Sequence, residues 1–161
     1  MLTQTELKSL YSYDAETGLF TRLARNSSRG KLGVPVGCKA AGYIVIGINT
    51  KKYPAHRLAW LYVYGKFPEK EIDHINMVRD DNRLCNLREA TRSENQMNRG
   101  KLSNNTSGHK GVSWHCVSKR WKAVIKIKGV VKHLGYFKDI KEAAKCYEDS
   151  AKKHYGEFAR F

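Results

Sequence analysis

The chain has 161 residues, of which 30 are Lys or Arg and 15 are Asp or Glu, so its formal net charge is +15. This length allows one modest core or two small ones, and we expect two compact units. The charge favours a polyanionic partner, and nucleic acid is a better candidate than an anionic membrane surface. A membrane-spanning segment and a signal peptide are both excluded by the pattern of apolar residues, so we expect a cytoplasmic protein with no membrane partner.

The first region, up to about Tyr64, contains two runs in which apolar residues alternate, TGLFTRL and GYIVIGINTKKY. Short alternating runs bounded by glycine predict β-strands. The next segment, PAHRLAWLYVYG, predicts a helix that begins near Pro54 and ends near Gly65. Within this region His56 and Arg57 could either contact DNA or brace the following segment.

Acidic residues are unevenly distributed along the chain. The stretches between Thr17 and Pro68 and between Gln96 and Lys138 contain no acid, whereas seven of the 15 acids lie between Glu69 and Glu94. We therefore expect a cation site in this middle region. The basic residues of the first acid-free stretch could form a loop on DNA or a patch that aids solubility; they include Arg22, Arg25, Arg29 and Lys31.

The middle region, from about Glu69 to Arg99, has too few apolar residues to form its own core, so it must pack against the first region. It contains the pair Asp73 and His74. Phosphodiester hydrolysis needs an oxygen ligand for a hard divalent cation and a base whose pKa lies near neutrality, and aspartate and histidine supply these groups. Neighbouring residues of an extended strand point to opposite sides, so a bend would be needed to bring both into one pocket.

Three of the asparagines that follow this pair have separate expected roles. The side-chain oxygen of Asn86, across a hairpin-like turn, could accept a hydrogen bond from one imidazole nitrogen of His74 and leave the other as the base. Asn95 falls in the first turn of a helix that Thr91 and Glu94 could open as a capping box, and it could complete the metal site. For Asn82 we expect a role in stabilising the turn rather than in chemistry.

A short linker of small polar residues, 100–108, precedes the last region. Residues 109–161 predict three strands and then a helix that begins at Asp139. Alternation in the second strand places Trp121, Ala123, Ile125 and Ile127 on one face and Lys122, Val124, Lys126 and Lys128 on the other. The helix has an apolar stripe formed by Ile140, Ala143, Ala144, Tyr147 and Ala151. The lysine face is thus left for phosphate groups.

The four cysteines are widely separated: Cys38, Cys85, Cys116 and Cys146. Because they form no Cys-x-x-Cys pair and no Cys/His cluster, a zinc finger or a disulfide framework is not expected. We expect reduced thiols, mostly buried.

The motifs IDHIN, DNRLCNLREAT and SENQMN together resemble those of the HNH endonucleases, and YPAHRLAWLYVYGKFPE is similar to the lead-in of phage and intron-encoded homing members. This resemblance implies a ββα-metal fold, a duplex DNA substrate and one divalent metal ion, Mg or Mn. It implies Asp73 and Asn95 as metal ligands, His74 as general base and Asn86 as the residue that orients it. Asn98, one helical turn further on, is an alternative ligand.

The last region resembles the Apetala-two/ethylene-response-factor DNA-binding domain of plant regulators, in which three antiparallel strands lie in the major groove and a helix packs behind them. Positions that hold arginines in the plant domains hold Lys110, Ser113, His115, Lys126 and His133 here. Lysine makes fewer bidentate contacts with bases, so we expect mainly backbone binding. Trp114 and Trp121 are expected more in the core than stacked on bases. The expected DNA contacts are Lys110, Trp114, Arg120, Lys122, Lys126, Lys128, Lys132 and His133.

These patterns predict an α+β fold, with a small ββα-metal nuclease domain followed by a three-stranded antiparallel sheet packed on one helix. The expected domains are residues 1–99, with the finger at about 69–99, and 109–161. The expected function is metal-dependent cleavage of duplex DNA by a homing-type endonuclease, a monomer or weak dimer in a phage-infected bacterium. Two alternatives stay open, a non-catalytic DNA-binding regulator and an RNA-binding protein.

Overall fold

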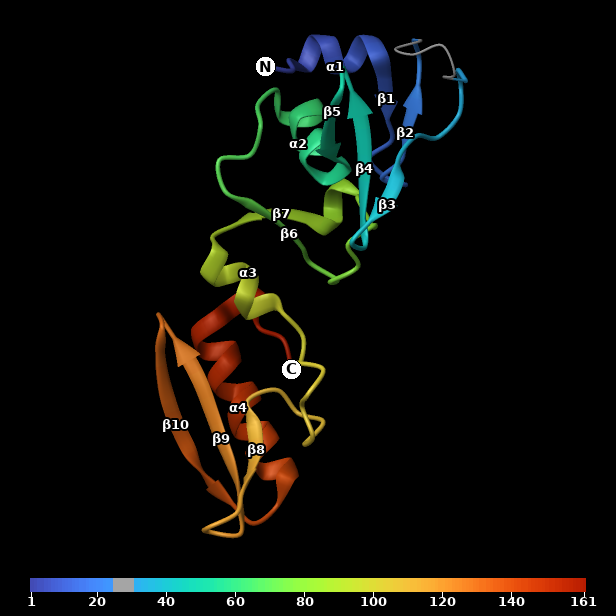
Figure 1. Cartoon of the computed structure of the whole chain (residues 1–161). Helices are drawn as coiled ribbons and strands as arrows, with labels where there is room; N and C mark the ends of the chain where they lie inside the picture. Colours follow the sequence, from blue (N-terminus) through green and yellow to red (C-terminus); the bar gives the residue numbers. More distant parts are fainter. Residues whose placement is uncertain (25–30) are drawn as a thin grey trace. The chain divides into compact units, whose positions relative to one another are not determined.

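The structure is a computed structural model that describes residues 1–24 and 31–161. It divides into two compact units, residues 1–91 and 92–161 (Figure 1). The unit boundary lies earlier than the predicted domain boundary after residue 99, because helix α3 (Arg92–Asn98) groups with the second unit. The assignment of nuclease and DNA-binding functions to separate domains stays a prediction. Arg25 and Arg29 of the predicted basic loop lie outside the described residues.

The first unit opens with a helix that the sequence analysis did not assign, α1 (Gln4–Leu10). A capping box starts it: Thr3 Oγ1 accepts a hydrogen bond from Glu6 N at 3.2 Å, and Glu6 Oε2 accepts one from Thr3 N at 2.8 Å. Such reciprocal bonds satisfy backbone N–H groups that a helix start leaves without partners. The Thr-x-x-Glu pattern was therefore a usable signal for this helix.

Two small antiparallel sheets follow, and they match the predicted strand-rich region. The first pairs β1 (Tyr11–Tyr13) with β2 (Phe20–Arg22). The second has the order β3 (Cys38–Ala40), β4 (Tyr43–Ile48), β5 (Lys51–Pro54). Helix α2 (Ala55–Tyr64) begins directly after Pro54 and ends at Gly65, whose φ of 78° is the left-handed conformation that glycine adopts without strain. The helix and both of its ends are confirmed.

Helix α3 groups with the second unit, so only the part of the middle region up to residue 91 packs on this scaffold as expected. This part forms a hairpin of β6 (Glu71–His74) and β7 (Leu87–Ala90), with a 3₁₀ turn, η1 (Leu84–Asn86), before the second strand. Ile72 and Leu87 join the core that Leu7, Phe20 and Leu58 form in the first unit. The hairpin thus depends on residues far away in the sequence for its burial.

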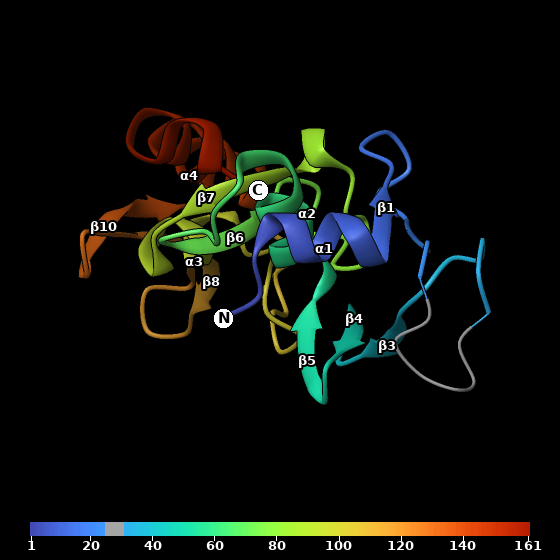
Figure 2. The same ribbon diagram turned by 90° about the horizontal axis from the view of Figure 1, so that it is seen from above.

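The second unit has the predicted order of three strands and a helix. An antiparallel sheet contains β8 (Val112–His115), β9 (Arg120–Ile127) and β10 (Val130–Phe137), with β9 in the centre. Helix α4 (Ile140–Tyr155) is capped by Asp139, whose side chain accepts a hydrogen bond from Lys141 N at 2.9 Å, and a 3₁₀ turn, η2 (Gly156–Phe158), follows it. Figures 1 and 2 show α4 along one side of this sheet. The predicted α+β fold class is confirmed.

Small side chains let α4 approach the sheet closely. Ala123 and Ile125 of β9 pack with Ala143 and Tyr147 of α4, which confirms the predicted faces of both elements. Gly111, just before β8, has a φ of +72°, and a Cβ there would lie 2.2 Å from the Tyr147 ring. The position requires glycine because any side chain would displace this ring.

All four cysteines are free thiols, as expected, but the expectation that most are buried is wrong. Cys38, Cys85 and Cys116 are exposed and Cys146 is half-buried. The exposed ones lie on the outer strand β3, in the turn η1 and between β8 and β9, where little packs over them.

No helix in the described ranges is long and apolar enough to cross a membrane.

Candidate active site

Asp73 and His74 are the last two residues of β6, and each faces a different residue of β7. Asp73 pairs with Arg88 and His74 with Leu87. Their exposed fractions are 3% and 5%, which is unusual for such polar side chains. Because adjacent strand residues point to opposite faces, the two side chains have separate surroundings.

The Asp73 carboxylate forms a buried ion pair across the hairpin. Its Oδ2 accepts a hydrogen bond from Arg88 Nε at 3.0 Å, and Arg88 Nη2 lies 2.9 Å from the same oxygen. The side chains of Arg88 and Asp73 are 13% and 4% exposed. The antiparallel register brings these opposite charges together in a place with little solvent.

The His74 imidazole contacts Asn82 in the loop between the two strands. His74 Nε2 lies 3.5 Å from Asn82 Oδ1, a long contact for a hydrogen bond. Asn82 Nδ2 donates to the Asp80 carbonyl oxygen at 3.2 Å, so the amide oxygen is the atom that faces the ring. An amide oxygen accepts and never donates, so this contact favours the neutral tautomer of His74 that carries its proton on Nε2.

Two aromatic rings cover this histidine. The centroids of Tyr43 and His56 lie 5.9 Å and 5.1 Å from that of His74. Burial lowers the pKa of His74 below its ordinary value. Burial, together with the neighbouring charges of His74 and Arg57, lowers the pKa of His56 to about 4. His56 is therefore neutral at neutral pH, and burial favours the neutral form of His74, which a general base requires.

Asn86 does not make the contact that we predicted for it. Its Oδ1 accepts a hydrogen bond from Asn76 N at 2.9 Å, and its Nδ2 donates to the Asp81 carbonyl oxygen at 2.8 Å. Asn86 therefore fixes the backbone of the loop, while Asn82 contacts the imidazole. Asn82 also makes the hydrogen bond within the turn that we expected of it, so it combines both contacts, because the path of the loop decides which amide reaches the ring.

Residues from the start of the chain hold the same loop from outside. Tyr13 Oη donates to the Asn82 carbonyl oxygen at 2.7 Å. Gly18 has a φ of +74°, and a Cβ there would lie 2.5 Å from backbone atoms of Asn82 and Arg83. Sequence reasoning missed both residues because nothing local relates positions so far apart.

The predicted metal ligands lie in different units. Asp73 belongs to the first, and Asn95 lies half-buried on α3 in the second. Asn98, the alternative ligand, is 3% exposed, and its Oδ1 accepts a hydrogen bond from Arg160 Nε at 3.0 Å, which indicates a structural role. Within residues 1–24 and 31–161 no group of three or more His, Cys, Asp or Glu side chains could hold a metal ion. One carboxylate and one amide oxygen are nevertheless a donor set that suits Mg²⁺, which also takes water and substrate phosphate as ligands.

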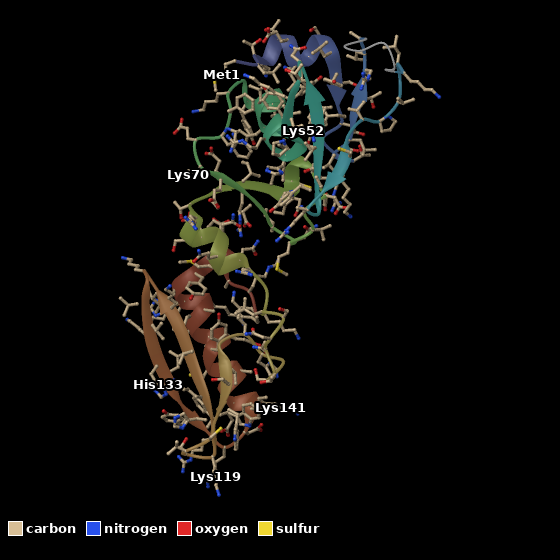
Figure 3. All side chains as sticks on the ribbon, in the orientation of Figure 1. Met1, Lys52, Lys70, Lys119, His133 and Lys141 are labelled. Atoms are coloured by element: carbon tan, nitrogen blue, oxygen red, sulfur yellow. The ribbon has the colours of Figure 1, made fainter. Side chains whose placement is uncertain are left out.

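The face of the second sheet that points away from α4 is basic and has no acidic residue. We call it the outer face, and register and alternation assign to it Ser113, His115, Arg120, Lys122, Val124, Lys126, Val131, His133 and Tyr136. The Tyr136 ring lies between two imidazoles, with centroids 5.0 Å from His115 and 4.5 Å from His133. Figure 3 labels His133 on the sheet and Lys141 at the start of α4.

Half of the predicted DNA contacts lie elsewhere. Lys110 Nζ donates to the Met97 carbonyl oxygen at 2.6 Å, and burial lowers the pKa of Lys110 to about 8. Lys132 pairs with the buried Ile125, which places it on the α4 side of the sheet. The other two are Trp114, which lies on the α4 side opposite Trp121 and is 48% exposed, and Lys128, in the turn between β9 and β10. The other four predicted DNA contacts lie on the outer face: Arg120, Lys122, Lys126 and His133.

Comparison with known proteins identifies the family. The family model for the HNH endonuclease matches residues 53–97. Protein 3.8 of Escherichia phage T7 is 32% identical over 107 residues, which cover 66% of this chain and 88% of the phage protein. The chain belongs to the family of this phage protein. Its HNH domain includes all four predicted positions, Asp73, His74, Asn86 and Asn95, and no solved structure matches the chain.

The buried His56 makes the stability of the first unit depend on pH. The unfolded chain binds a proton at this residue near pH 6.5 and the folded chain near pH 4, so folding releases a proton between these values and stability falls as the pH is lowered through this window. We expect His56→Phe to remove about 3 kcal/mol of this pH dependence. Urea unfolding of both proteins between pH 7 and pH 4 measures it. Parallel stability curves would contradict the assignment.

Proposed function

We propose that the chain is a metal-dependent endonuclease that hydrolyses phosphodiester bonds of duplex DNA. The observation that carries this proposal is the buried His74, whose contact with Asn82 Oδ1 favours one tautomer, next to the acidic Asp73 on the same strand of an HNH domain. The family supports nuclease chemistry. The geometry supports His74 as its base.

In the proposed reaction His74 Nδ1 takes a proton from the attacking water. Asn82 holds the ring through Nε2, so the basic nitrogen keeps its direction. The rings of Tyr43 and His56 shield the imidazole from solvent, which favours its neutral form at the pH of the cell. A positioned base of this kind contributes roughly 10²- to 10⁴-fold to a rate.

Asp73 and Asn95 are the residues that would hold one Mg or Mn ion. The ion, when bound, supplies positive charge that stabilises the phosphate and the leaving 3′ oxygen. Both residues offer oxygen atoms, which hard divalent cations prefer. Since one such site cuts one strand, double-strand cleavage requires a dimer or two binding events, and we propose a monomer or weak dimer in a phage-infected cell.

The second unit is proposed to bind DNA in the manner of Apetala-two-like domains. Its support is a three-stranded sheet with a cationic outer face, on which Arg120, Lys122 and Lys126 stand on the central strand. Lysine ammonium groups contact phosphate well and discriminate bases poorly, so this unit would contribute more to DNA affinity than to sequence specificity.

A second candidate function has one observation in its favour. Tyr136 is 41% exposed on the outer face and is flanked by His115 and His133, and exposed rings on a sheet can stack on single-stranded RNA bases. Binding competition between duplex DNA and single-stranded RNA separates the two functions. Preferential retention of RNA would favour the second.

Replacement of the base should abolish cutting and spare binding. We expect His74→Ala to lower the single-turnover cleavage rate with Mg²⁺ by at least about 100-fold, because the imidazole transfers a proton and contributes little to affinity. DNA affinity should change less than about threefold, since one uncharged side chain is lost. Cleavage of plasmid DNA and a gel-shift assay measure the two quantities.

The exposed His154 on α4 provides the control for this experiment, and His154→Ala should cut at the wild-type rate. A His74→Ala protein that still cuts near the wild-type rate would show that another group is the base. Loss of cutting in the wild type on adding a chelator checks the metal requirement.

Salt dependence tests the outer face. Neutralising Arg120, Lys122 and Lys126 together with glutamine should reduce the slope of log affinity against log salt concentration by about 3, because each lost phosphate contact reduces it by about 0.9. The matched control removes three exposed lysines from α4, Lys141, Lys145 and Lys153. Equal changes in the two triple variants would show that the charge of the protein matters but this face does not.

A further inference from the structure

The ion pair of Asp73 with Arg88 lies at the residue proposed to bind the metal ion. Two guanidinium nitrogens, Nε and Nη2, approach the single oxygen Oδ2 at 3.0 Å and 2.9 Å. Arg88 also sits directly opposite Asp73 in the register of β6 and β7, so the backbone holds the two side chains at this distance. The contact is therefore part of the hairpin in the metal-free protein.

Burial explains why Asp73 needs a cationic neighbour. Its carboxylate side chain is 4% exposed, and an ionised group with so little solvent is stable only when a partner compensates its charge. Arg88 supplies a positive charge in the protein without metal. A divalent cation would supply the same compensation once it is bound.

A metal ion bound at Asp73 Oδ2 would compete with Arg88 for this oxygen. A guanidinium donates hydrogen bonds to the oxygen lone pairs that a metal ion uses, and two positive charges close to each other repel. Binding of either one must then weaken binding of the other, by the same factor in both directions.

We infer that Arg88 is a positioning residue that holds Asp73 in the metal-free protein, yields Oδ2 to the incoming cation and thereby lowers metal affinity. This inference rests on the proposed function, in which Asp73 is a metal ligand. Arg88 keeps the hairpin folded before the metal arrives and makes loading reversible.

A nearby ion pair provides a matched control. Arg83 Nη2 lies 2.6 Å from Asp81 Oδ2, in the loop between the same two strands, and the Arg83 side chain is 47% exposed. This pair has the same chemistry but involves no proposed ligand. Its loss should therefore not change metal binding.

The experiment uses the full chain at pH 8 without DNA and Mn²⁺ as the probe. Thermal unfolding and calorimetric titration with Mn²⁺ are compared for the wild type, Arg88→Met, Arg83→Met, Asp73→Asn and the double variant Asp73→Asn/Arg88→Met. We expect Arg88→Met to lower the Tm of the metal-free protein by about 10 °C or more, because a buried charge loses its partner. Mn²⁺ should restore most of this loss, and its affinity should rise at least about tenfold over that of the wild type.

The remaining variants separate this role from simple structural support. Arg83→Met should bind Mn²⁺ as the wild type does, and Asp73→Asn should lose Mn²⁺ binding. The double variant should recover stability without responding to Mn²⁺, since both buried charges are gone. If Arg88→Met is too unstable to study alone, Arg88→Lys, which keeps the charge with fewer donors, should give an intermediate Mn²⁺ affinity.

Cleavage by the wild type distinguishes the two ways of failing. If the wild type cuts DNA with metal while Arg88→Met gains neither Mn²⁺ affinity nor Mn²⁺-dependent stability, Arg88 is structural and the inference is overturned, but the proposed function stands. If the wild type neither cuts DNA nor binds Mn²⁺, the proposed function fails and the inference fails with it.

Discussion

A buried neutral imidazole needs an acceptor for its N–H group, and the contact of His74 Nε2 with Asn82 Oδ1 meets this need. The rest of the site depends on it. Asn86 shapes the loop that carries Asn82, and Tyr13 and Gly18 hold the same loop from the first 20 residues of the chain. Several parts of the first unit thus fix the position of the loop that contacts His74.

The surroundings of His74 and Asp73 control the charge of each side chain in different ways. Rings and burial hold His74 in its neutral form, whereas Arg88 compensates the charge of Asp73. The strand separates these environments, because its neighbouring side chains leave from opposite faces. A short β-hairpin can therefore carry a covered imidazole beside an ion-paired carboxylate, the two groups that we propose as base and metal ligand.

Sequence predicted the elements with strong local signals, such as α2 between Pro54 and Gly65 and the alternating faces of β9. The motifs around Asp73 and His74 also predicted them as site residues, and their roles stay a prediction. Sequence reasoning assigned the contact with the imidazole to Asn86, whereas Asn82 makes it, since only the folded loop shows which amide reaches the ring. The pairing of Lys132 with Ile125 depends on the register between β9 and β10, which cannot be predicted from the sequence of either strand alone.

The central claim is that His74 is neutral and protonated at Nε2, which leaves Nδ1 as the base. Long-range ¹H–¹⁵N NMR of histidine-labelled protein reports this directly, because it distinguishes the two neutral tautomers from the imidazolium ion. The chain has six histidines, and the signals absent from His74→Ala assign the relevant ring. At pH 7 the account predicts a neutral ring with its proton on Nε2 and loss of this tautomer preference in Asn82→Ala. A proton on Nδ1, or a charged imidazolium at that pH, would contradict it.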